Sequence, residues 1–228
     1  LLDGYFYGAN LSKANLTDAD LAGTDLRRTN LHQANLRRAN LQGALLDSAN
    51  LDGASLVEAD LESAYLDDAS LAHADLHEAS LRGADFRFTH LGGANLQRAN
   101  LENANMEGAN LVKARLDSAT LTMTVLYKAN LSAANLHGAS LHHAVLIGTQ
   151  LARADLRKAD LTEIYGPNAH LQQAWLSEAN LELANLVAAD LSQADISHAV
   201  VVQTNLQETN LRGANLSASD LTGALLNN

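Results

Sequence analysis

Cysteine is absent from the 228-residue sequence, and proline occurs only once. The lack of cysteine excludes a disulfide framework and any site that needs a thiolate. No run of about 18 apolar residues occurs, which excludes a membrane-spanning helix. Aromatic residues make up 4% of the chain although 47% is hydrophobic, so the apolar content is mostly Leu and Ala. Such a composition is unusual for a globular domain.

Basic residues are also scarce: 15 Lys and Arg stand against 26 Asp and Glu, for a net charge of −11. A broad phosphate-binding surface needs the opposite balance, so we predict no direct binding of nucleic acid. The sequence has no glycine-rich phosphate loop and no serine motif of the nucleophile-elbow kind. We therefore predict a protein that is not an enzyme and has no cofactor. No signal segment opens the chain, so a cytoplasmic location is favoured.

A five-residue period runs from end to end. One column of the repeat, at positions 1, 6, 11 and onward to 226, has 46 residues, of which 40 are Leu. A second column, at positions 4, 9, 14 and onward to 224, has 45 residues, of which 35 are Ala. Between Ala and Leu, 27 of 45 residues are Asn or Asp. A helix advances by about 500° in five residues, so these Leu would never form a stripe. An Ala and the Leu two residues later do share a face of an extended strand.

The chain must turn between one Leu and the next Ala, because three residues of continued strand would point that Ala outward. Eleven of the 14 glycines stand at the second of the two variable positions, as at Gly23 and Gly43. Glycine adopts turn dihedrals at the least cost. The period therefore predicts a short strand and a turn every five residues, with both apolar side chains inside a coil.

The motif Ala-(Asn/Asp)-Leu-X-X, as in Ala9-Asn10-Leu11 and Ala19-Asp20-Leu21, resembles the pentapeptide repeat proteins over essentially the whole chain. That family is commonest among bacteria, especially cyanobacteria. The resemblance implies an all-β fold, a right-handed quadrilateral β-helix with four repeats in each coil. At 20 residues a coil, the chain would make about 11 coils and a rod roughly 55 Å long.

We interpret residues 1–228 as one solenoid domain with an irregular repeat at 162–170. There Gly166 replaces the central Leu and Pro167 follows it. Because proline removes a hydrogen-bond donor, we expect a kink or bulge at this repeat. The repeat is already running at residue 1, so we also expect a fragment or a processed form of a longer protein.

One wall of the rod is predicted to be selectively apolar. Every twentieth position, starting from Tyr5, reads Tyr, Asp, Leu, Tyr, Asp, Asn, Val, Val, Tyr, Asn, Asn, Leu. Exposed apolar patches mark partner contacts, although a tolerance for residues of high β-propensity would give the same column. The predicted apolar interaction wall, for a protein partner or a second copy of the chain, comprises Tyr5, Tyr7, Leu45, Tyr65, Phe88, Met123, Val125, Tyr127, Val145, Ile147 and Tyr165.

Acidic residues form a second candidate surface. Residues 39–81 contain nine acids and neither Lys nor Arg, and we assign seven of the acids to an acidic belt: Asp47, Asp52, Glu58, Asp60, Glu62, Asp67 and Asp68. Some pentapeptide repeat proteins protect topoisomerases by imitating DNA, so gyrase protection is an alternative function. A duplex of the expected length would carry about 30 charges, far more than this chain, and the belt lies on all four walls. A non-catalytic interaction module is therefore the main prediction.

Nine histidines raise the possibility of a metal site, and His137, His142 and His143 form the densest group. On the expected rod His143 sits one coil from Glu163. Their spacing along the sequence matches no known ligand motif. We interpret them as solvated surface histidines and predict no metal.

Overall fold

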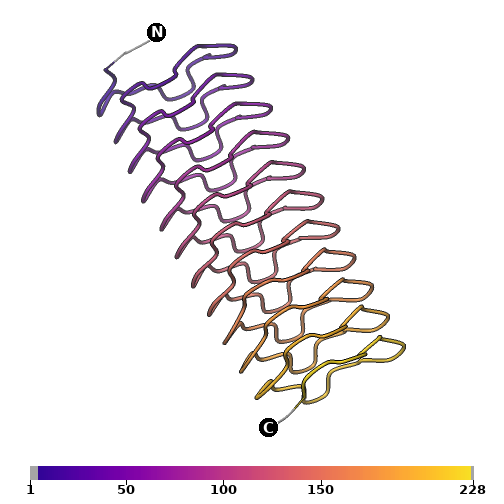
Figure 1. Ribbon diagram of the computed structural model, residues 1–228. Coiled ribbons are helices and arrows are strands. Elements are labelled where there is room, and N and C mark those ends of the chain that lie inside the picture. Colours follow the sequence, from indigo (N-terminus) through magenta and orange to yellow (C-terminus); the bar gives the residue numbers. More distant parts are fainter. Residues whose placement is uncertain (1–4, 227–228) are drawn as a thin grey trace.

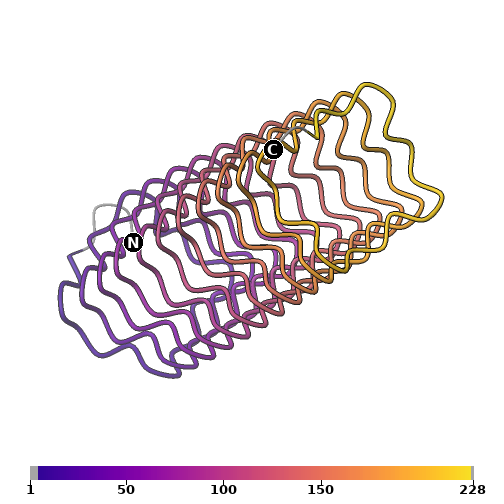
Figure 2. The ribbon, with the colours of Figure 1, turned by 90° about the horizontal axis from the view of Figure 1, so that it is seen from below.

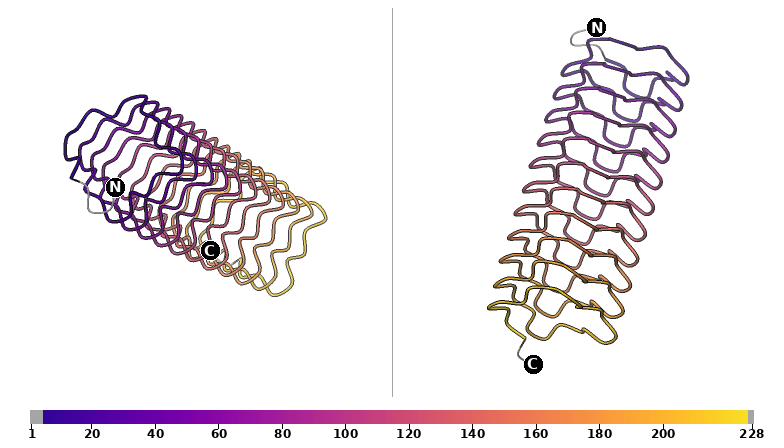
Figure 3. Two further views of the ribbon diagram at one scale, coloured as in Figure 1. Left: turned by 90° about the horizontal axis from the view of Figure 1, so that it is seen from above. Right: turned by 90° about the vertical axis from the view of Figure 1, so that its right-hand side faces the viewer.

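The computed structural model describes residues 5–226, which form one straight rod with the N- and C-terminal ends at its opposite tips (Figure 1). Successive coils lie on one another in sequence order along the whole rod (Figures 2 and 3). The chain is a right-handed quadrilateral β-helix, as the resemblance implies. The predicted repeat positions Leu1 and Gly4, like the two ends of the predicted domain 1–228, lie outside the described residues.

Backbone pairing repeats every 20 residues. The residue between Ala and Leu in each repeat forms a parallel bridge with its equivalent one coil later, from Tyr5 with Asp25 to Asn205 with Leu225. The strands are thus single residues, and residues 5–226 contain neither a helix nor a longer strand. None of these residues lies in a helix that could cross a membrane.

Four ladders of bridges run along the rod, one on each wall. We call them the first, second, third and fourth ladder; they begin at Tyr5, Asn10, Asn15 and Asp20. Two hydrogen bonds hold each step: in the second ladder the N–H of Asn30 donates to the C=O of Ala9 at 2.9 Å, and the N–H of Leu11 donates to the C=O of Asn30 at 2.8 Å. Each coil is therefore fixed to both of its neighbours on every wall.

The turns between walls share one conformation. The second variable residue of every repeat from 8 to 223 has a positive φ, between 53° and 73°. In the first complete turn of the second wall the N–H of Ala14 donates to the C=O of Leu11 at 3.0 Å. The N–H of Lys13, the residue with positive φ, donates to the C=O of His32 in the next coil at 2.8 Å. Non-glycine residues adopt this unfavourable conformation because the stack holds each turn in place.

The side chains of Asn and Asp at the bridge positions serve the turn that follows. Oδ1 of Asn10 accepts a hydrogen bond from the N–H of Ser12 at 3.1 Å, and Oδ1 of Asn130 accepts one from Ser132 at 3.0 Å. This N–H belongs to the first variable residue and donates no hydrogen bond to the backbone. The local hydrogen bond explains why this position favours Asn and Asp.

The Leu and Ala columns fill the interior. From Leu21 to Leu206 every residue of the Leu column except Gly166 is at most 4% exposed. Six of the seven Thr residues in the Ala column are buried too, and their hydroxyls donate to backbone carbonyls, as Thr124 does to Leu101 at 2.9 Å. Thr can therefore replace Ala here without leaving a buried hydroxyl unpaired.

The expected kink at residues 162–170 is wrong, because the ladders pass through this repeat without interruption. Tyr165 bridges both Val145 and Asn185, and the N–H of Gly166 donates to the C=O of Asn185 at 2.8 Å. Pro167 occupies the first variable position, where no ladder donor is needed and where a turn favours proline. The missing Leu side chain leaves an apolar cavity of about 10 Å³, lined by Leu146, Leu151, Leu161, Ile164, Ala169, Leu171, Leu176, Leu181 and Leu186.

Replacing Gly166 with Ala should stabilise the protein by about 0.4–1 kcal/mol. Gly166 does not have a positive φ, and an added Cβ would lie 3.2 Å from Cδ2 of Leu186 and 3.5 Å from Cβ of Leu146. Leu186 borders the cavity and has room to move. Urea unfolding followed by circular dichroism measures the change. Gly43→Ala, at a φ of +60° with no atom within 4 Å, should instead destabilise, and a loss of stability in Gly166→Ala would contradict the argument.

Candidate interaction surfaces

The first ladder carries the core of the predicted apolar wall. Its bridges join Val125 to Val145 and Val145 to Tyr165 in three consecutive coils. The side chains at these bridge positions point away from the core, since the flanking Ala and Leu point into it. Tyr165 is 49% exposed, and the two Val side chains are half-buried against their neighbours. The arrangement gives a continuous apolar strip along one wall.

A second apolar row lies beside that strip, two residues further along each coil. Consecutive members of this row, such as Tyr127, Ile147 and Pro167, are joined through the residue that follows each of them. The N–H of Lys128 donates to the C=O of Ile147 at 3.0 Å, and the N–H of Gly148 donates to the C=O of Pro167 at 3.1 Å. We define the apolar patch as the two rows together: Val125, Val145, Tyr165, Tyr127, Ile147, Pro167 and Val187.

The sequence prediction missed Pro167 and Val187. Pro167 had been interpreted only as a disruption of the ladder. The 20-residue period that relates the column from Tyr5 also places four apolar residues of the column from Tyr7 in one row: Tyr127, Ile147, Pro167 and Val187. Periodic reading of the turn positions was therefore the available signal.

Other members of the predicted wall lie apart from the patch. Tyr5 and Tyr7 are at the N-terminal end, where their rings stack at 6.2 Å, and Leu45 and Tyr65 pair with each other between Asp25 and Asp85. Phe88 is an exposed turn residue of an earlier coil.

Met123 is an exposed turn residue that flanks the patch two residues before Val125. Five further exposed apolar residues lie outside both the prediction and the patch: Trp175, Leu183, Val200, Leu225 and Leu226.

The acidic belt encircles its coils. Asp60 lies in the fourth ladder, while the other six belt residues occupy turn positions at different corners. Several of them are already paired within the chain: Glu58 with Arg37, and Asp67 with Arg87 at 3.8 Å. A ring of partly neutralised acids does not follow the two strands of a duplex, and DNA mimicry stays a prediction.

Two arginines at turn positions are paired with acids of the neighbouring ladder positions. Arg27 Nη2 lies 2.7 Å from Asp25 Oδ2, and Arg157 Nη2 lies 2.6 Å from Asp155 Oδ2. These hydrogen bonds lower the pKa of both Asp25 and Asp155 below the usual range. The guanidinium of Arg157 also lies over the ring of Trp175, at 5.4 Å from its centroid. Such pairs form internal contacts and offer little to a nucleic acid.

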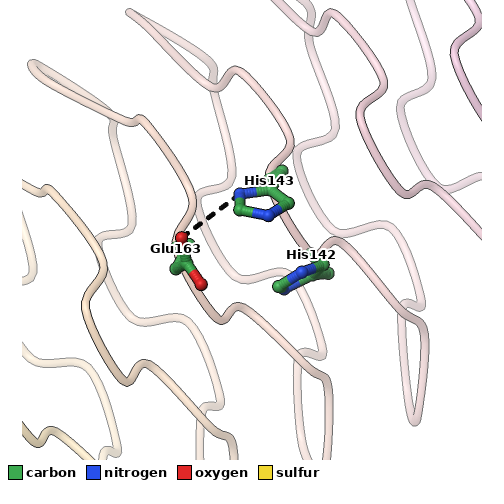
Figure 4. A group of neighbouring side chains, drawn as sticks. All are labelled: His142, His143 and Glu163. Carbon is green, nitrogen blue, oxygen red and sulfur yellow. Dashed lines mark ion pairs between the residues drawn. The ribbon is translucent and has the colours of Figure 1, made fainter.

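The structure brings two of the predicted histidines together and leaves the third apart. His142 and His143 form the two central residues of one turn, with ring centroids 3.9 Å apart, and Glu163 lies beside them in the next coil (Figure 4). Nδ1 of His143 is 3.5 Å from Oε2 of Glu163. His137 is not a member of this group.

Comparison with known proteins supports the interpretation of the repeat. The sequence profile of pentapeptide repeats matches in eight copies over residues 5–43, 44–83, 84–122, 124–163, 168–200 and 189–228. Residues 164–167, in the irregular repeat, fall between two matched segments. No relative among curated protein sequences matches the chain.

Several solved structures are similar to the chain, and two of them are described next. One is HetL, a pentapeptide repeat protein involved in heterocyst differentiation regulation from the cyanobacterium Nostoc sp. strain PCC 7120; identity is 34%, 97% of this chain and 90% of that chain are covered, and the TM-score is 0.78. The other is QnrB1, a plasmid-mediated fluoroquinolone resistance protein, at 18% identity, 70% and 90% coverage and a TM-score of 0.44.

Proposed function

Because the chain belongs to the pentapeptide repeat family, we propose that it is a non-catalytic interaction module that binds a protein through the outer faces of its β-helix. The contact surface in this proposal is the apolar patch, and the bound protein is a different chain or a second copy of this one.

The apolar patch is the observation that carries the proposal. Seven apolar side chains from adjacent coils lie together on a wall whose backbone is fixed by ladder hydrogen bonds. The equivalent bridge positions of the second ladder in these coils are polar: Asn130, Gln150, His170 and Asp190. Contiguous exposed apolar area, rimmed by polar residues, is typical of a protein-binding site.

The chemistry of the surface depression on the rod is consistent with the same proposal. This shallow depression has a volume of about 420 Å³, and its lining has no acid, histidine or cysteine: Val112, Ser132, Ala133, Ala152, Arg153, Gln172 and Gln173. Acid–base or nucleophilic chemistry needs such groups in mutual contact. HetL is involved in heterocyst differentiation regulation, a role that an interaction module can serve.

The double variant Val125→Asp with Val145→Asp should abolish association. It puts two carboxylates at the centre of the patch, and a contact that buries them without partners loses several kcal/mol. Light scattering after size exclusion measures self-association, and crosslinking in a lysate from the source cells measures binding to other proteins.

The matched control is Asn110→Asp with Asn130→Asp on the second ladder. It adds the same charge in neighbouring coils and retains the Oδ1 acceptor that holds the turns at Val112 and Ser132. This variant should associate as the unmodified protein does, with an unchanged circular dichroism spectrum in both variants. Identical oligomeric state and identical crosslinked proteins for the patch variant and the unmodified chain would reject the proposal.

A further inference from the structure

We infer that His142, His143 and Glu163 form a binding site for a divalent transition-metal ion of the Zn²⁺ type. Each of the three side chains offers one ligand atom, and all of these atoms lie within 4.8 Å of one another. The inference concerns this chain alone and does not depend on any protein partner.

The backbone holds the three residues at one corner of the rod (Figure 4). His143 and Glu163 are equivalent turn residues in consecutive coils, with φ values of 57° each. The N–H of His143 donates to the C=O of Thr162 at 3.1 Å, and the N–H of Glu163 donates to the C=O of Glu182 at 2.9 Å. The turns are thus fixed by the ladder, and only side-chain rotation remains to be ordered on binding.

The separations are those of ligands on one ion. Zn–N and Zn–O bonds of about 2.0–2.1 Å in a tetrahedron place two ligand atoms roughly 3.4 Å apart. Nδ1 of His143 and Oε2 of Glu163 are already 3.5 Å apart. The widest separation in the group, at most 4.8 Å, exceeds the tetrahedral value by about 1.4 Å. Rotation of these exposed or partly exposed side chains can close that gap.

The donor set selects the class of ion. Two imidazole nitrogens with one carboxylate oxygen suit Zn²⁺ and its neighbours, whereas Ca²⁺ and Mg²⁺ prefer oxygen ligands alone. Three protein ligands leave a fourth position for water or for a group of another molecule. The site lies beside the apolar patch, because Val145 and Tyr165 follow His143 and Glu163 by two residues each.

The local charge also favours a cation. Residues 159–211 contain seven acids and neither Lys nor Arg. Glu182 is in the coil that follows Glu163, at the same corner of the rod. The net charge of the whole chain, these acids included, is −11. Within residues 159–211, no Lys or Arg side chain therefore competes with an ion for the Glu163 carboxylate.

Isothermal titration of the full chain with ZnCl₂ tests the inference. We expect one ion per chain, and at least tenfold weaker binding in His143→Gln and in Glu163→Gln. Glutamine is compatible with both backbone positions, because Gln33 and Gln173 have φ values of 56° and 58° in equivalent turns. Co²⁺ in place of Zn²⁺ should give the visible absorption of a tetrahedral site, which an ordinary surface ion pair does not.

The control variant is His137→Gln, which removes the nearby histidine outside the group and should leave binding unchanged. Equal loss in all three variants, unchanged binding in His143→Gln and Glu163→Gln, or no saturable binding to the unmodified chain would overturn the inference. None of these measurements involves association, so they are independent of the test of the apolar patch.

Discussion

Replacement of Leu116 with Ala should lower the free energy of unfolding by about 2–5 kcal/mol. The Leu116 side chain is completely buried in the middle of the rod, and its column neighbours Leu96 and Leu136 are buried as well. Its backbone N–H donates to the C=O of Asn135 at 2.6 Å. Because the ladders fix the coils above and below, the interior cannot collapse into the cavity left by the deleted atoms. Urea unfolding followed by circular dichroism measures the loss.

Leu16→Ala is the matched control, since Leu16 holds the equivalent position near the N-terminal end of the rod and is only partly buried. It should cost clearly less than Leu116→Ala. Repeat arrays can open locally before they unfold as a whole, so hydrogen exchange at the Leu116 and Leu136 amides gives a second readout. Equal costs at Leu16 and Leu116 would show that interior packing does not dominate the stability.

Enlargement of Ala114 to Leu should destabilise the protein by about 1–3 kcal/mol or more. Ala114 is fully buried next to Leu116 on the same wall, and its N–H donates to the C=O of Leu111 at 2.9 Å. The added carbons must enter a space that four walls already fill with one Ala and one Leu each. Thermal unfolding of the variant and the unmodified chain under one buffer condition measures the effect.

The same substitution at Ala133, an exposed turn residue, serves as the control and should change the melting temperature little. Ala114→Thr adds polarity with little volume and should be tolerated far better than Leu, since Thr hydroxyls in this column find carbonyl acceptors. A Leu variant at Ala114 as stable as the Ala133 variant would mean that the interior is loosely filled.

The Leu and Ala columns predicted the interior well because a five-residue period permits only a coil that turns after each pair. Gly43 and its equivalents located the turn, and every equivalent position has a positive φ. The effect of Pro167 was not predictable from proline chemistry alone. Proline chemistry tells which backbone N–H is missing, but only the hydrogen bonds between the coils show that the ladders do not need this N–H. The role of Asn10 and Asn130 likewise depends on their turn hydrogen bonds.

The candidate sites were harder to predict than the fold. Val125 and Val145 were found by reading a twenty-residue column, and their ladder pairing follows from the same period. Pro167 was left out because it stood in an irregular repeat. The spacing of His142, His143 and Glu163 along the sequence fits no ligand motif, although one coil brings them together. Ligand motifs describe residues that are brought together by the local geometry of one chain segment. In a solenoid, residues one coil apart are also neighbours, and such motifs do not include them.

The bridges between residues 20 apart also set what insertions and deletions can do. Removal of one whole coil shortens the rod by one step of about 4.8 Å and leaves every later side chain on its original wall. Removal of a single repeat of five instead rotates everything downstream by a quarter turn, so that Val145 would continue a different ladder from Val125. Insertions or deletions of four repeats therefore keep every downstream side chain on its original wall. A change of one, two or three repeats moves all downstream side chains to other walls.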